Sequence, residues 1–297
     1  MSDEGDRLVD TAAGPLNVRM RQSESAPVLA IHGVSSTNRL WLWLRDAAPW
    51  ATLIEPDLAG RGLSPARDAE ASTPAEHADH LVALLDALDV ETVDVIGMSM
   101  GGFVGVELAA GHPSRVRSLT LVDGGLPVPE PPEGRPPLEA VAAHGRAAYG
   151  DTTDWPSLAA YVDRYTSTAG PLLDAADPRV SEMLAHDLAH GTDGGPVRRD
   201  LDTVLADLLE VSCTSRPAQV WTKVTTPMRL VHAEWSIGAG TSPMYPADHV
   251  ASLLAATPPL VSAELVEGVD HAAIIMTPHG AARCAAALSA NLTGGVS

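Results

Sequence analysis

The feature that most constrains this chain is a Gly-x-Ser-x-Gly motif centred on Ser99. An apolar β-type run at residues 93–96 leads into it, and residues 103–110 after it are compatible with a helix. Glycine is needed on both sides of the serine because a β-carbon there would collide with the adjoining strand and helix on so sharp a turn. The pattern therefore predicts a strand, a strained turn and a helix, with Ser99 exposed as a nucleophile.

Short apolar β-type runs recur along the chain, and segments with helical spacing separate them. They lie at residues 28–31, 52–54, 93–96, 119–122, 228–231 and 260–266. Between the second and third, leucines at 81, 84, 85 and 88 show the spacing of an amphipathic helix over residues 76–88. Residues 7–11 and 17–21 suggest a leading hairpin. This alternation predicts an α/β fold, with a mainly parallel, eight-stranded-type sheet and helices on both faces.

Composition changes sharply after Gly125, because six prolines fall within residues 127–137. Proline donates no ladder hydrogen bond and disrupts helices, so we expect an extended connector there. Regular strand signals return only after a long stretch with helical patches. We therefore predict an α/β core built from residues 1–125 and 227–297, and a helical lid or cap insertion at residues 126–226.

Two further motifs flank the serine in the sequence. His32-Gly33 follows the first of the parallel strand candidates, and the backbone N–H of Val34 is expected to join that of Met100 in an oxyanion hole. His271 ends a Glu-Gly-Val-Asp-His segment after the last strand candidate. A histidine there can return over the sheet and act as the general base for the serine.

Taken together, these motifs resemble the α/β-hydrolase superfamily. The His-Gly pair, the Gly-Arg-Gly-Leu-Ser segment at residues 60–64, the serine turn and the Gly-x-Asp-His segment occur in the order of that family and span nearly the whole chain. The resemblance implies that Ser99 is the nucleophile and His271 the base. A serine at the turn speaks against haloalkane dehalogenase or epoxide hydrolase chemistry, for which the family uses an Asp nucleophile.

The acid of the triad is where this sequence departs from the commonest family pattern, in which an Asp follows the penultimate strand. Ser236 occupies that position, and a hydroxyl cannot stabilise an imidazolium as a carboxylate does. Asp123 ends the strand candidate at residues 119–122, an acid location that some family members, including certain thioesterases and lactone hydrolases, use. We expect Asp123 to be the acid, with Glu234 as the alternative.

Composition narrows the class of partner. A formal net charge of −19 argues against nucleic-acid or anionic-membrane binding, which requires clustered Lys and Arg. No apolar run approaches the roughly 20 residues of a membrane span, and the polar start after Met1 has no signal-peptide core. Cys213 and Cys284 lie far from any His-rich or Cys-x-x-Cys pattern, so the sequence suggests neither a metal site nor a disulfide framework. We expect a cytoplasmic protein that acts on a small-molecule substrate without metal or cofactor, and the oligomeric state stays open.

The expected reaction is hydrolysis of a carboxylic ester or lactone of a small apolar substrate through an acyl-enzyme. Trp155, Tyr161 and Tyr165, in the predicted lid, are expected to contact that substrate. Thioester or carbon–carbon bond hydrolysis on the same triad is an alternative. A non-catalytic ligand-binding protein with this fold is another, and the missing Asp at position 236 is its main support.

Overall fold

The computed structural model describes residues 5–67, 72–129, 134–150 and 154–294. In these ranges the strands form one eight-stranded sheet in the order β1-β2-β4-β3-β5-β6-β7-β8. The strands are β1 (Asp6–Val9), β2 (Leu16–Arg21), β3 (Pro27–Ile31), β4 (Thr52–Pro56), β5 (Val93–Met98), β6 (Val116–Val122), β7 (Met228–Ala233) and β8 (Leu260–Val266). Only the pairs β1–β2 and β2–β4 are antiparallel within this sheet, so the predicted mainly parallel sheet is confirmed.

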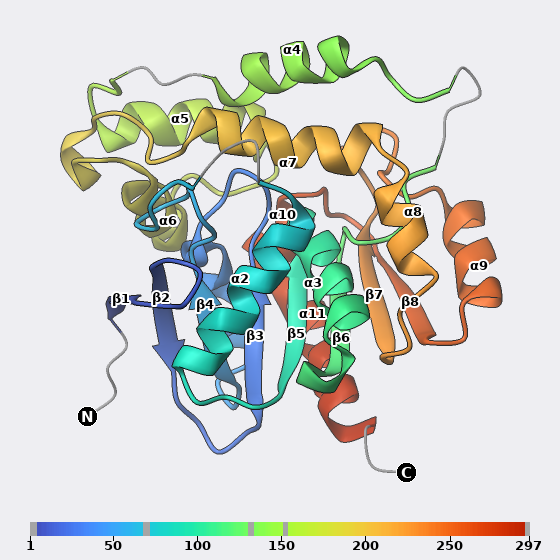
Figure 1. Ribbon diagram of the computed structural model, residues 1–297. Coiled ribbons are helices and arrows are strands. Elements are labelled where there is room, and N and C mark those ends of the chain that lie inside the picture. The colour runs from blue at the N-terminus through green and yellow to red at the C-terminus, as the bar shows by residue number, and fades with distance from the viewer. Residues whose placement is uncertain (1–4, 68–71, 130–133, 151–153, 295–297) are drawn as a thin grey trace.

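Helices cover both faces of the sheet because its central strands are apolar on both sides (Figure 1). In β3, Val28 and Ala30 belong to one buried cluster, while Leu29 and Ile31 belong to the other, as the two-residue period of a strand requires. The first cluster includes residues of α1 (Leu42–Ala47), α10 (Ala273–Met276) and α11 (Pro278–Gly294), and the second includes residues of α2 (Pro74–Ala87), α3 (Met100–Gly111), α8 (Arg216–Trp221) and α9 (Ala247–Ala256).

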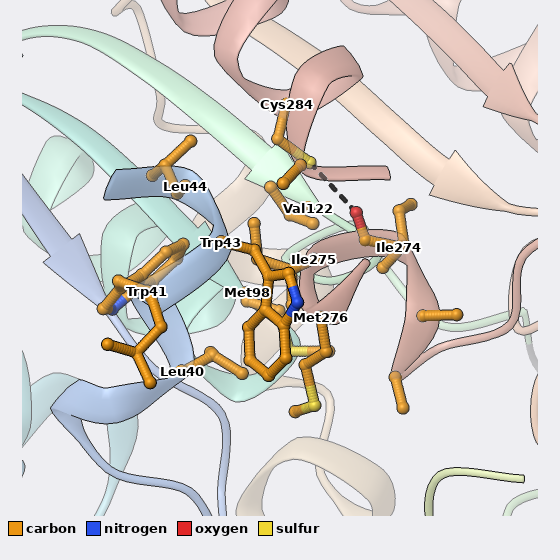
Figure 2. Close-up of a cluster of buried hydrophobic side chains, with 14 of the residues drawn as sticks. Leu40, Trp41, Trp43, Leu44, Met98, Val122, Ile274, Ile275, Met276 and Cys284 are labelled. Carbon is orange, nitrogen blue, oxygen red and sulfur yellow. Dashed lines mark hydrogen bonds between the residues drawn. The ribbon is translucent and has the colours of Figure 1, made fainter. Parts of the chain in front are cut away.

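The tryptophans that follow the His-Gly segment pack in the core. Trp41 is 0% and Trp43 1% exposed, and both lie in the cluster that includes Ile274, Met276 and Cys284 (Figure 2). In the same cluster the Cys284 thiol donates to the carbonyl of Ile274 at 3.5 Å. These two indoles therefore fix α1 and α10 against the sheet.

The segment between β6 and β7 is helical in its described part. It forms α4 (Leu138–Tyr149), α5 (Leu158–Thr168), α6 (Pro178–Asp187), α7 (Leu201–Cys213) and α8. Figure 1 shows α4, α5 and α7 grouped over one end of the sheet. The start of α7 is fixed by Asp200, whose carboxylate accepts the N–H of Thr203 at 2.8 Å.

Two parts of the sequence-based interpretation fall outside the described residues. Residues 1–4 hold the polar start of the chain, and residues 130–133 hold Pro131 and Pro132 of the predicted connector. In the part of the chain that the structure describes, no helix is both long and apolar enough to cross a bilayer.

Candidate active site

Ser99 stands on a strained turn between β5 and α3. Its backbone has φ 55° and ψ −122°, in the left-handed half of conformational space that side chains with a β-carbon rarely adopt. A β-carbon on Gly101 would lie 1.9 Å from the carbonyl oxygen of Ile31, and one on Gly97 would lie 2.2 Å from that of Gly101. The helix therefore approaches β3 and β5 so closely that both positions require glycine.

Asp123 and His271 form a direct hydrogen bond. The Nδ1 atom of His271 lies 2.6 Å from Oδ2 of Asp123, which is only 1% exposed. The other carboxylate oxygen accepts the backbone N–H of Ala233 at 3.1 Å, so both oxygens are held. Asp123 itself has a positive φ of 42° at the end of β6. The bond leaves Nε2 as the imidazole nitrogen free to accept a proton.

The two positions near the end of β7 make other contacts. Oε2 of Glu234 accepts the backbone N–H of Gly268 at 2.7 Å. Ser236, at the family's common acid position, offers its backbone carbonyl to the N–H of His271 at 3.0 Å. Glu234 and Ser236 therefore shape the loop that carries the histidine, while Asp123 contacts the imidazole ring.

The oxyanion candidates lie on two sides of the serine. Met100 is the first residue of α3, and Val34 follows the His-Gly segment after β3. A β-carbon on Gly33 would lie 3.3 Å from the Ser99 β-carbon, which shows how near this segment comes. Two hydrogen bonds of the buried His32 ring fix the segment: Nε2 accepts the N–H of Leu58 at 2.9 Å, and Nδ1 lies 2.8 Å from the carbonyl of Gly33. Since Nε2 accepts, the ring proton is on Nδ1.

A cavity of about 310 Å³ joins these groups. Ser99, His271, Val34 and Met100 all line it. Most of its other lining residues are apolar. They come from α3, from the segment between β6 and β7 and from the loop after β7: Phe103, Val128, Tyr149, Asp207, Leu208, Val211, Ser212, Ser236, Ile237 and Met244. Helix α7 therefore forms one wall of the cavity that holds the serine.

The three aromatic residues predicted to contact substrate lie elsewhere. Trp155, Tyr161 and Tyr165 line a second cavity of about 90 Å³. Tyr149 lines both cavities, and Ser35 of the small one directly follows Val34 of the large one. The structure thus brings the three aromatic side chains to a cavity that adjoins the one holding Ser99, and they do not line the cavity of Ser99 itself.

Comparison with known proteins identifies the fold. A family model described as the α/β hydrolase fold matches residues 26–154. The solved structure of E-2-(acetamidomethylene)succinate hydrolase covers 98% of this chain and is itself covered to 99%, with a TM-score of 0.79 and 21% sequence identity. The chain therefore has the α/β-hydrolase fold.

The curated relatives that resemble this chain match part of its length. The chain is 36% identical over 159 residues to "Lipase LipV" of Mycobacterium tuberculosis (strain ATCC 25618 / H37Rv), a match that covers 50% of this chain and 60% of the relative. It is 38% identical over 101 residues to "2-hydroxymuconate semialdehyde hydrolase" of Pseudomonas sp. (strain CF600), covering 32% and 35%. The chain thus spans between a third and two thirds of the length of these relatives.

A buried ion pair that sequence reasoning missed ties this α/β-hydrolase site to α7. Arg61, from the Gly-Arg-Gly-Leu-Ser segment, donates to Oδ2 of Asp207 at 2.6 Å and to the carbonyl of Val34 at 2.9 Å. Asp207 also contacts Nε2 of His77 at 2.9 Å. The spacing of Asp207, Leu208 and Val211 on one helix face was a usable signal, because i, i+3 and i+4 positions share a face. No local pattern in the sequence indicates that Arg61 is the partner of Asp207.

No group of three or more His, Cys, Asp or Glu side chains with the geometry of a metal site is found among the described residues. The buried side chain of His186 contacts a carboxylate, since its Nε2 atom lies 3.2 Å from Oδ2 of Asp57.

Proposed function

We propose that this chain is a serine hydrolase that cleaves a carboxylic ester or lactone of a small, mainly apolar substrate through an acyl-enzyme. The observation that carries the proposal is that Ser99, on its strained turn, shares one cavity with His271, whose far ring nitrogen is bonded to Asp123. A nucleophile, a base and a carboxylate that orients the base are the three groups that acyl transfer by serine requires.

The proposed mechanism assigns each proton. His271 donates its Nδ1–H to Asp123, so Nε2 accepts the proton of Ser99 as Oγ attacks the carbonyl carbon. The backbone N–H groups of Val34 and Met100 would hold the oxyanion of the tetrahedral intermediate. The imidazolium then returns its proton to the leaving group. Water attacks the acyl-enzyme in the same way, with His271 again as base.

Carbon–carbon bond hydrolysis is a second candidate. It is favoured by the 38% identity with the protein named 2-hydroxymuconate semialdehyde hydrolase, over a region of 101 residues. A panel that offers p-nitrophenyl butyrate, a medium-chain lactone, the matching thioester and 2-hydroxymuconate semialdehyde would rank these reactions by kcat/KM.

The helical segment at residues 126–226 would act as a lid in this scheme. Support comes from Leu208 and Val211 of α7, which line the cavity of the serine.

A cytoplasmic location also remains a proposal. Cys213 and Cys284 are both free thiols, which fits a reducing compartment. Cell fractionation would test this location.

Labelling with a fluorophosphonate probe tests the proposed function. Wild-type protein should be labelled at one site, and Ser99→Ala should abolish the label together with p-nitrophenyl butyrate hydrolysis. Ser167→Ala is the matched control, because Ser167 is an exposed serine on α5. If Ser99→Ala were labelled as strongly as Ser167→Ala, the proposal would be wrong, and a non-catalytic ligand-binding protein would become the better reading.

A further inference from the structure

The small cavity beside Ser99 is rich in hydrogen-bond donors that have weak acceptors or none. The indole Nε1–H of Trp155 is buried and has no hydrogen-bond partner within the described ranges. Among the residues that the structure describes, the hydroxyl of Tyr165 has a single hydrogen-bond partner, the thioether sulfur of Met276 at 3.7 Å, which is a weak acceptor. Buried donors are nearly always satisfied in proteins, so donors left over in one cavity are available to a ligand that supplies the acceptor.

Arg199 adds a positive charge to this set. Its guanidinium lies 5.9 Å from the ring centroid of Tyr149, and its Nη1 is 3.4 Å from the carbonyl of that residue. No carboxylate of the described residues lies within ion-pair distance of Arg199. Asp187 attracts it electrostatically but is engaged by the hydroxyls of Thr37 and Tyr161, each at 3.4 Å. In a chain with net charge −19, a half-buried arginine with no carboxylate of the described residues in ion-pair contact is a candidate for anion recognition.

The chemistry of the walls selects the kind of anion. Burial raises the pKa of the Tyr161 and Tyr165 phenols above their usual range, so both stay protonated. Because Tyr161 donates its proton to Asp187 at 3.4 Å, Tyr165 is the phenol that can donate to a ligand. A cavity of about 90 Å³ has the volume of roughly three water molecules, which suits a small planar group and not a second whole substrate. Guanidinium groups bind carboxylates through two parallel hydrogen bonds.

We propose that this cavity binds a carboxylate carried by the substrate, with Arg199 as the residue that recognises it. Tyr149 lines both cavities, and Ser35 follows the oxyanion candidate Val34, so the anion would sit in the cavity next to the one that holds the reacting carbonyl. The inference rests on the proposed serine hydrolase activity and narrows its substrate class to esters that bear a second, ionised acid group.

Two matched ester pairs test this inference. Mono-p-nitrophenyl adipate against p-nitrophenyl hexanoate places the charge on the acyl side, and para-carboxyphenyl butyrate against phenyl butyrate places it on the leaving group. Wild-type enzyme should prefer the charged member of at least one pair in kcat/KM. Arg199→Gln should lower that preference by about 10- to 100-fold, mainly through KM, and Arg199→Lys should restore part of it.

Arg198→Gln is the matched control. Arg198 is a neighbouring half-buried arginine that donates to the carbonyl of Ala189 at 2.9 Å and does not line the small cavity, so its loss should leave the preference unchanged. No preference for the charged ester in either pair would overturn the inference, as would an equal loss in Arg198→Gln and Arg199→Gln.

Calorimetric binding to Ser99→Ala protein separates the inference from the proposed function. Adipate monoester that binds this variant more tightly than hexanoate ester, with the difference lost in Ser99→Ala/Arg199→Gln, supports the anion site even if wild-type protein turns over no ester. Equal binding of the two esters overturns it.

Discussion

His271 and Asp123 are 148 residues apart in sequence, yet His271 Nδ1 and Asp123 Oδ2 lie 2.6 Å apart. The contact is possible because β6 and β8 lie on either side of β7 and run parallel to it. The loops that follow β6 and β8 therefore meet at the same edge of the sheet. The carboxylate is thus supplied one strand nearer to the serine than Ser236, where the superfamily commonly has its acid. Its second oxygen is bonded to the N–H of Ala233, which leaves little freedom to swing away.

Asp123→Asn should reduce kcat by about 10⁴-fold if this carboxylate serves the histidine. The amide keeps the shape of the side chain but favours the wrong imidazole tautomer and cannot stabilise the imidazolium. Steady-state kinetics with p-nitrophenyl butyrate measure the loss. Glu234→Gln is the matched control and should cost less than about tenfold, because Glu234 contacts a backbone N–H and not the ring. A reversal of the two penalties would exchange the assignments.

Gly101→Ala should destabilise the protein by about 3 kcal/mol, since the new β-carbon would lie 1.9 Å from the carbonyl oxygen of Ile31 and force α3 away from β3. Urea unfolding gives the change in free energy. Gly111→Ala, at the other end of the same helix, meets nothing within 4 Å and should be neutral or stabilising by up to about 1 kcal/mol. Equal effects at the two positions would mean that close approach is not what requires Gly101.

The sheet, the turn at Ser99 and the helix after it follow from local patterns, and for that reason they could be predicted. Apolar runs with the right period specify strands, and two flanking glycines specify a turn that admits no β-carbon. The expectation that Asp123 is the acid came from a less local argument, since its strand candidate ends at a position where some members of the resembled family carry their acid.

The lining of the cavity could not be predicted in the same way. Which face of α7 meets the serine depends on how the helices between β6 and β7 pack, and the pairing of Arg61 with Asp207 joins residues 146 positions apart. The aromatic residues Trp155, Tyr161 and Tyr165 were expected around the substrate, and that role remains a prediction, now through the small cavity. Packing between distant helices has no short-range signature in a single sequence.

Asp207→Asn should destabilise the fold by about 3–5 kcal/mol, because it leaves the buried guanidinium of Arg61 without its counter-charge. Chemical denaturation measures this. The control is Asp79→Asn, which removes the partner of His112 from a 67% exposed position and should change the free energy of unfolding by less than about 0.5 kcal/mol. A similar small change for Asp207→Asn would show that the buried pair contributes nothing to stability.

The last prediction concerns His32 and acid stability. Burial lowers the pKa of His32 to about 4, from 6.5, and its Nε2 is occupied by the N–H of Leu58. In the unfolded chain the ring takes up a proton below about pH 6.5, whereas in the folded chain it does so only near pH 4. The neutral ring therefore contributes stability that is present above pH 6.5 and is lost as the pH falls from 6.5 to 4.

A shift of this size corresponds to about 3 kcal/mol, at roughly 1.4 kcal/mol for each pKa unit. His32→Gln supplies a side chain that can donate and accept but does not titrate, so all other titrating groups are common to the two proteins. The free-energy advantage of wild type over His32→Gln, measured by urea unfolding, should shrink by about 3 kcal/mol between pH 7 and pH 4. An advantage that stays constant over this range would mean that His32 takes up its proton equally in the folded and unfolded chains. In that case the hydrogen bonds to Leu58 and Gly33 would not hold the ring neutral.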